Sequence, residues 1–297
     1  MVKNVTVVGA GQMGNGIAHV FAMADFEVTI FDISDVALQK GLANISKNLD
    51  RMLTKGTIDE AKKNATLQHI SLETSLEKAV QKADLIVEAA TENVALKLKI
   101  FTDLDQHAPE HCILATNTSS ISITKIAAAT KRPDKVIGMH FMNPVPVMRL
   151  VEVIKGYATS AETTKTTMDL SKTIGKTPVE VNDYPGFVAN RILMPMINEA
   201  ITTLFEGVAG VAEIDTVMKL GMAHPMGPLQ LADFIGLDTC LAIMRVLHDG
   251  FGNPKYAPCP LLVNMVMAGR MGVKSGEGFY SYTHGTKDLI VSPQFSM

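Results

Sequence analysis

The sequence is short of the features that mark several large protein classes. Its three cysteines, Cys112, Cys240 and Cys259, are far apart, odd in number and form no CxxC pair. That distribution argues against a disulfide framework or a zinc site, and it suits a reducing compartment. No apolar run approaches the roughly 18 residues that a membrane-spanning helix needs. We therefore expect neither a disulfide-linked secreted domain nor a membrane protein.

The sequence also lacks a large excess of positive or negative charge. Lysine and arginine number 27 against 30 for aspartate and glutamate, so no basic surface for nucleic acid is indicated. The first residues, MVKNVTVVGAGQMG, lead directly into glycines and are unlike a secretory signal. We therefore expect a cytoplasmic protein without nucleic-acid or membrane partners.

Two common catalytic signatures are missing. The sequence contains no HExxH motif, and we expect no metal site. Ser119, in NTSSIS, does not stand in a GxSxG turn, so a serine hydrolase is not indicated. Because it follows an expected strand, this serine is a candidate for bonding a substrate oxygen instead.

The first part of the chain alternates short β-branched runs with longer helical patterns. Strands are expected at residues 5–9, 27–32, 85–89, 112–117, 136–141 and 150–154. Such near-continuous apolar runs suit a parallel sheet with helices on both faces, so a doubly wound, Rossmann-like α/β domain is predicted. From NDYPGFVANR (182–191) onward, helical patterns dominate. We therefore place the sheet domain at 1–183 and a mostly α-helical domain at 184–297.

The first expected strand runs into GAGQMG (residues 9–14), which has GxGxxG spacing. Gly9 permits a tight turn, Gly11 permits close approach of a pyrophosphate, and Gly14 permits close packing of the following helix. The N-terminus of that helix would offer unpaired N–H groups to the phosphates. Asp32, at the end of the next expected strand, is placed to bond the adenosine ribose and would repel a 2′-phosphate. NAD is therefore the predicted cofactor, in preference to NADP.

Two ionisable residues lie inside expected apolar strands, His140 in VIGMHF and Glu152 in LVEVI. Histidine suits the oxidation of an alcohol because its usual pKa lies near working pH, and a carboxylate on its other ring nitrogen would fix the tautomer. Taken singly, His140 also suits a hydrogen-bonded core position and Glu152 a strand end at the surface. Spacing alone favours these structural interpretations over a catalytic pair.

A basic stripe is present in NISKNLDRMLTKG. Lys47, Arg51 and Lys55 are four residues apart, so a helix would carry them on one face. Such a stripe could receive the 3′-phosphate of coenzyme A. A solvated helix face is the alternative that spacing alone favours.

Taken together, the motifs resemble those of the 3-hydroxyacyl-CoA dehydrogenases over essentially the whole chain, and most of all their short bacterial 3-hydroxybutyryl-CoA dehydrogenase branch. The matching blocks, in family order, are GAGQMGNGIA, ATNTSSISI, GMHFMNPVPVMRLVEVI, PGFVANRI, HPMGPLQLADFIGLD and GVKSGEGFY. The His–Asn–Pro and MGP blocks together are far more specific than GxGxxG. One departure is HFMNP, where the family commonly has HFFNP; Met142 fills similar apolar volume.

The resemblance implies the residues of the active site. His140 would be the general acid/base, oriented by Glu152, while Ser119 and Asn190 would complete the substrate pocket. The residues implied to contact NAD are Gly9, Gly11, Gln12, Met13, Gly14, Asp32, Glu92, Lys97, Ser119, Asn143 and Lys274.

The resemblance also implies the reaction and the partners. The chain would be an NAD-dependent oxidoreductase that interconverts acetoacetyl-CoA and (S)-3-hydroxybutyryl-CoA, with Arg51 and Lys55 contacting the acyl-CoA. The helical domain would bind substrate and form a homodimer. One alternative is a longer-chain 3-hydroxyacyl-CoA dehydrogenase of fatty-acid oxidation. Another, from a different class, is a non-catalytic NAD-binding structural protein.

Overall fold

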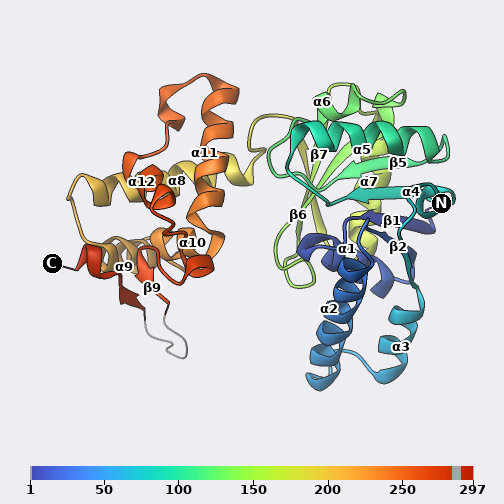
Figure 1. The fold of residues 1–297 in the computed structure, drawn as a ribbon, viewed down its shortest axis with the longest axis horizontal. Helices are drawn as coiled ribbons and strands as arrows, with labels where there is room; N and C mark the ends of the chain where they lie inside the picture. Colours follow the sequence, from blue (N-terminus) through green and yellow to red (C-terminus); the bar gives the residue numbers. More distant parts are fainter. Residues whose placement is uncertain (1, 283–288, 297) are drawn as a thin grey trace. The chain divides into compact units, whose positions relative to one another are not determined.

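The computed structural model describes residues 2–282 and 289–296. Internal contacts divide the chain into two compact units, Met1–Tyr184 and Pro185–Met297. The first unit contains the sheet and the helices that cover it, and the second is built mainly of helices (Figure 1).

An eight-stranded sheet with the order β3-β2-β1-β4-β5-β6-β7-β8 forms the centre of the first unit. Its strands are β1 (Asn4–Val8), β2 (Glu27–Phe31), β3 (Ile70–Glu73), β4 (Leu85–Glu88), β5 (Ile113–Thr116), β6 (Val136–Phe141), β7 (Leu150–Lys155) and β8 (Thr177–Asn182). Strands β1 to β6 pair in parallel, in the order typical of a dinucleotide-binding sheet. The predicted doubly wound α/β fold is confirmed.

The sheet is mixed, however, because β7 runs antiparallel to β6 and β8 then runs parallel to β7. The expectation of a parallel sheet is therefore wrong at β7. Only residues 142–149 connect β6 to β7. A parallel neighbour requires a crossover of roughly a dozen residues or more, so this connection is too short for one. The reversal places His140 directly opposite Glu152.

Helices cover both faces of the sheet. They are α1 (Gln12–Met23), α2 (Asp35–Thr54), α3 (Glu60–Gln68), α4 (Leu76–Val80), α5 (Val94–His107), α6 (Ile123–Ala127) and α7 (Ala161–Thr173), with a 3₁₀ turn at Pro133–Lys135. Alternate strand residues, such as Ile137 and Met139 of β6, join one apolar cluster with α1, α2 and α7. The intervening residues face α4, α5 and α6, as Gly138 does where it approaches Ile123. Figure 1 shows α2 and α3 as a helical hairpin beyond the sheet.

In the described part of the second unit, five helices pack around an apolar core. They are α8 (Ala189–Phe205), α9 (Val211–Gly221), α10 (Pro228–Ile235), α11 (Leu237–Phe251) and α12 (Pro260–Met267), followed by the short strands β9 (Tyr280–Ser281) and β10 (Ile290–Val291). Short 3₁₀ turns lie at Pro254–Tyr256, Val273–Ser275 and Pro293–Phe295. Across the described residues, no helix has the length and apolar character to cross a membrane.

Two buried aspartates tie the C-terminal part of the second unit to its helices. Asp215 accepts the Leu229 N–H at the start of α10 and, at 2.8 Å, the hydroxyl of Tyr280. Asp233 accepts the backbone N–H of Tyr280 and the hydroxyl of Tyr282. Burial raises the pKa of Asp233 to about 6. These bonds hold the chain after α12 against α10.

A buried histidine lies within α1, in the first unit. The His19 side chain is fully buried, and its Nε2 lies 3.1 Å from Met23 Sδ, while its Nδ1 has no hydrogen-bond partner among the described residues. Burial, and secondarily the charge of Lys176, lower the pKa of His19 from 6.5 to about 4. The folded protein therefore holds this ring neutral at pH values where an unfolded chain would protonate it.

Folding stability should fall as the pH falls from about 6.5 to about 4. In this range His19 binds a proton in the unfolded state but stays neutral in the folded state. At about 1.4 kcal/mol per pKa unit, the free energy of unfolding should drop by up to about 3 kcal/mol. Urea unfolding at several pH values measures this dependence. His19→Gln should make the free energy of unfolding less dependent on pH, and His107→Gln, at an exposed histidine, is the control. An unchanged pH dependence in His19→Gln would assign the acid sensitivity to other groups.

Candidate active site

The structure brings together three of the residues predicted to be catalytic. His140 Nδ1 lies 2.8 Å from Glu152 Oε2, and His140 Nε2 lies 3.0 Å from Ser119 Oγ. His140 is 6% exposed and Glu152 2%. Because a carboxylate can only accept, Nδ1 carries the proton of that bond. Nε2 is then the ring atom that can take up or release a proton.

The sheet register explains this meeting. Opposite residues of an antiparallel pair point to the same face, with Cβ atoms roughly 5 Å apart. His140 and Glu152 are such a pair, on the face covered by α4, α5 and α6. Ser119 follows β5, the parallel neighbour of β6 on its other side. Glu152, which taken singly also suited a strand end at the surface, is thus the third residue of β7 and is buried.

The GxGxxG loop joins β1 to α1. Gly9 has a φ of +103°, which favours glycine, and a Cβ on Gly14 would stand 1.8 Å from the carbonyl oxygen of Gly9. A Cβ on Gly11 would meet no atom within 4 Å. The loop therefore leaves open space beside Gly11, at the N-terminus of α1.

Asp32 lies directly beyond β2, beside this loop. Its Oδ2 accepts the Ala10 N–H at 2.9 Å, and its Oδ1 accepts the Ser34 N–H at 3.0 Å. The carboxylate therefore braces the glycine loop and the start of α2. Carboxylate oxygens accept more than one bond, so these contacts leave capacity for ribose hydroxyls.

Glu92 and Lys97 lie near Ser119. Glu92 accepts the Ser119 N–H at 2.6 Å and the Thr118 hydroxyl at 2.8 Å. Lys97 is 1% exposed, and its ammonium group bonds to Glu88, a residue that the sequence interpretation missed. A hollow of about 220 Å³ is lined by Met13, Ala89, Ala90, Thr91, Glu92, Lys97, Asn117 and Ser119.

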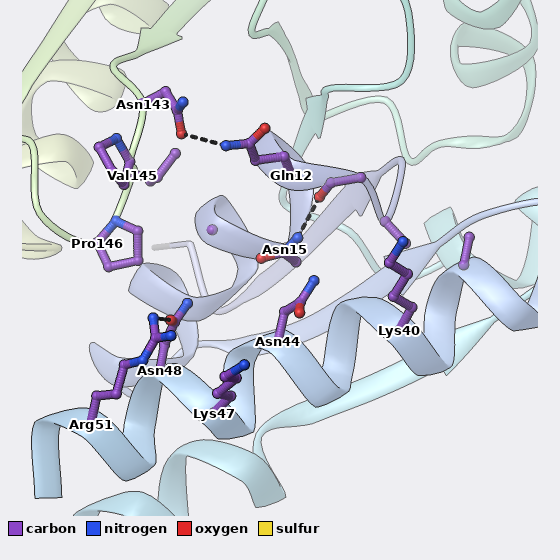
Figure 2. A pocket seen from close by; sticks show the side chains of 15 residues that line it. Gln12, Asn15, Lys40, Asn44, Lys47, Asn48, Arg51, Asn143, Val145 and Pro146 are labelled. Carbon is purple, nitrogen blue, oxygen red and sulfur yellow. Dashed lines mark hydrogen bonds between the residues drawn. The ribbon is translucent and has the colours of Figure 1, made fainter. Parts of the chain in front are cut away.

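A larger hollow of about 620 Å³ lies between α1, α2 and the chain after β6 (Figure 2). Its α2 wall carries Lys40, Asn44, Lys47, Asn48 and Arg51, which follow helical spacing on one face. Gln12, whose amide donates to Asn143 Oδ1 at 3.1 Å, lines the opposite wall. The basic face thus begins at Lys40, before the predicted stripe, which began at Lys47. The sequence interpretation missed Lys40 and the two asparagines, Asn44 and Asn48.

Lys55 departs from the predicted stripe. Helix α2 ends at Thr54, so Lys55 lies just beyond it and is not among the residues that line the larger hollow.

Asn190 is the second residue of α8, in the second unit. Lys274, also in the second unit, donates to Asp238 Oδ1 at 2.8 Å and to Thr239 Oγ1 at 3.0 Å.

No metal centre is formed by the described residues, among which no group of three His, Cys, Asp or Glu side chains could hold an ion. One histidine pair does have HxxxH spacing, His107 and His111 in HAPEH. The pair is not on one helix, because α5 ends at His107. His111 Nε2 instead lies 3.0 Å from Asp84.

Comparisons with known proteins agree over nearly the whole chain. Family models described as "3-hydroxyacyl-CoA dehydrogenase, NAD binding domain" and "3-hydroxyacyl-CoA dehydrogenase, C-terminal domain" match residues 4–184 and 186–282. A probable 3-hydroxybutyryl-CoA dehydrogenase of Bacillus subtilis is 56% identical over 96% of this chain and 99% of its own. The mitochondrial hydroxyacyl-coenzyme A dehydrogenase of Rattus norvegicus is 44% identical over 95% and 92%. The crystal structure of (S)-3-hydroxybutyryl-CoA dehydrogenase from Ralstonia eutropha matches with a TM-score of 0.93 and 52% identity, covering 95% of this chain and 100% of that one.

Two glycine substitutions should separate packing from ligand binding in the loop. Gly14→Ala should lower the free energy of unfolding by more than about 2 kcal/mol, because its Cβ meets backbone that cannot yield. Gly11→Ala should change it by less than about 0.5 kcal/mol but weaken NADH binding at least about tenfold, by filling the phosphate space. Urea unfolding and NADH fluorescence titration measure both effects. Normal NADH affinity in Gly11→Ala would show that phosphate does not approach this glycine.

Proposed function

The chain belongs to the 3-hydroxyacyl-CoA dehydrogenase family, and we propose that it interconverts acetoacetyl-CoA and (S)-3-hydroxybutyryl-CoA with NAD(H). The observation that carries the proposal is His140, held between a buried carboxylate on one ring nitrogen and a hydroxyl on the other. A reversible ketone reduction needs such a group, since a proton must enter or leave the 3-oxygen as hydride moves. The four-carbon substrate is supported by relatives of that name at 56% and 52% identity.

His140 exchanges the proton through Nε2. In the reducing direction the imidazolium donates its Nε2 proton to the ketone oxygen, and in the oxidising direction the neutral ring accepts the hydroxyl proton. Glu152 keeps the proton on Nδ1 and stabilises the positive ring by its charge. Ser119, 3.0 Å from Nε2, donates to the same substrate oxygen and directs it toward His140. Asn190, in the second unit, is proposed as a further substrate contact.

The cofactor proposal rests on the glycine loop and on Asp32. When bound, NADH supplies the hydride. The open space at Gly11 accommodates the pyrophosphate, and the Asp32 carboxylate accepts the adenosine ribose hydroxyls while disfavouring a 2′-phosphate. Further proposed contacts are those of Gln12, Met13, Glu92, Lys97, Ser119, Asn143 and Lys274.

The larger hollow is the proposed site for the anionic end of coenzyme A. Lys40, Lys47 and Arg51 project three positive charges from one face of α2, with asparagine amides between them. Charge-assisted bonds from such groups suit phosphate oxygens, and arginine can bind them with two parallel bonds. Lys55 stays a weaker candidate, because it lies beyond the end of the helix.

A longer acyl chain is the alternative substrate within the same reaction class. A profile of activity against acyl length from four to sixteen carbons would decide between them. The non-catalytic alternative is disfavoured by the intact His140–Glu152–Ser119 geometry beside an open glycine loop. A folded chain that binds NADH yet reduces no 3-ketoacyl-CoA would favour it.

A second copy of this chain is the proposed protein partner, through the helical unit. Support comes from large apolar side chains exposed there, including Val217 at 60%, Leu220 at 83% and Met222 at 61% on and beside α9. Sedimentation equilibrium should give twice the mass of the chain, and Leu220→Glu should shift the protein toward the monomer. A monomer at all concentrations would refute the dimer.

Absorbance at 340 nm should report rapid NADH oxidation with acetoacetyl-CoA and none with free acetoacetate.

His140→Ala should lower kcat by about 10²–10⁴-fold, since it removes the proton donor. Glu152→Gln should lower kcat less and leave NADH binding near normal. NADPH should be a poorer reductant than NADH because of Asp32. Near-normal turnover by His140→Ala would exclude the proposed mechanism.

Arg51→Ala combined with Lys47→Ala should raise the KM for acetoacetyl-CoA at least about tenfold, because charged hydrogen bonds to phosphate are lost. The KM for NADH should stay within about twofold. Lys99→Ala, which removes an exposed lysine paired with Asp103, is the matched control. Lys55→Ala separately tests whether recognition extends past the helix end. An unchanged KM in the double variant would remove α2 from the substrate site.

A further inference from the structure

Glu88 is a fully buried carboxylate at the end of β4. Its Oε1 accepts the Ala90 N–H at 2.9 Å. Its Oε2 accepts the Thr116 hydroxyl at 2.8 Å and also bonds the Lys97 ammonium. Thr116 is its register partner on β5, and both point to the face covered by α4, α5 and α6.

Charge balance makes Glu88 and Lys97 depend on each other. Lys97 is 1% exposed, so neither partner can exchange its bond for water. A buried ion pair is maintained only when good geometry and extra hydrogen bonds offset the loss of hydration, and removal of one partner leaves an uncompensated charge. Thr116 and Ala90 supply the extra bonds on the side of the carboxylate.

The pair is connected to the proposed catalytic groups through Glu92. The Lys97 ammonium lies 3.9 Å from the half-exposed carboxylate of Glu92. Glu92 in turn accepts the Ser119 N–H, and Ser119 Oγ lies 3.0 Å from His140 Nε2. Contacts thus run without a break from Glu88 to the atom that exchanges the proton.

We propose that Glu88 is a positioning residue for the reductase reaction, which acts by neutralising Lys97. With Glu88 in place, the ammonium is held back from Glu92, whose carboxylate remains available to hold Ser119. Without the charge of Glu88, the nearest anion for Lys97 is Glu92. A shift of Glu92 toward Lys97 would loosen Ser119 and misplace the hydroxyl that orients the substrate oxygen. The inference rests on the proposed function for its kinetic consequences.

Glu88→Gln keeps the shape and removes the charge. It should lower kcat at least about tenfold, because small misplacements in a reacting complex are costly. Thr116→Val, which leaves the ion pair intact, should have a smaller effect on kcat. The control is Glu73→Gln, because Glu73 also ends a strand and accepts the N–H two residues on, at Ser75, but is partly exposed.

A double-mutant cycle tests whether Glu88 acts through Lys97. If it does, Glu88→Gln should have little further effect on kcat in a Lys97→Met background, because the ammonium group that would draw Glu92 away from Ser119 is absent there. The charge-neutral double variant also serves if Glu88→Gln alone does not fold. An equal loss of kcat in both backgrounds, or no loss in either, would overturn the proposal.

A measurement without substrate separates this inference from the proposed function. The Ser119 nitrogen lies 2.6 Å from Glu92 Oε1, to which its N–H donates. The amide proton of Ser119 should therefore resonate downfield in a heteronuclear NMR spectrum of the unmodified chain. Glu88→Gln should move it upfield, and Glu73→Gln should not. Failure to reduce acetoacetyl-CoA would refute the proposed function but leave this shift intact. An unmoved Ser119 resonance in folded Glu88→Gln would refute the positioning role whatever the reaction.

Discussion

The antiparallel pairing of β6 with β7 is the constraint on which the candidate site depends. In a sheet that is otherwise parallel as far as β6, this step sets His140 and Glu152 directly opposite each other. The ladder hydrogen bonds of two buried strands hold both backbones, so the imidazole–carboxylate contact needs no loop to create it. An imidazole anchored in this way is oriented before any ligand arrives, and such preorganisation lowers the reorganisation that a reaction needs.

Two buried carboxylates on the same face of the sheet serve this site in different ways. Glu152 meets an imidazole that can gain or lose a proton, whereas Glu88 meets an ammonium group and two polar donors. Both follow the same strand periodicity, in which alternate residues face α4, α5 and α6. In such dry surroundings an unpaired charge is costly, so each carboxylate fixes the position of its partner. Rigid positions for Lys97 and His140 follow from that cost.

The central part of the fold could be predicted from sequence because buried strands are almost continuously apolar. The sequence interpretation missed the edge strands β3 (ISLE) and β8 (TPVEVN). Both are partly exposed and contain polar residues, so they lack the continuous apolar pattern of the buried strands. Strand direction at β7 is not encoded in the apolar run, but the short connection 142–149 was a usable signal. Glu88 lies in the apolar run LIVEA just as Glu152 lies in LVEVI, so the same argument could have found it. The end of α2 before Lys55 depends on local capping that residue spacing does not reveal.

The short connection after β6 links the two parts of the site. It compels the chain to reverse, which brings Glu152 to His140, and it then forms a wall of the larger hollow with Asn143. Lys176 holds this wall through bonds to the carbonyl oxygens of Val145 and Met148. Val145 packs so closely on α1 that a Cβ on Gly16 would stand 2.9 Å from it. Because one segment sets both the reversal and the wall, its length cannot change without disturbing the His140–Glu152 contact and the shape of the larger hollow together.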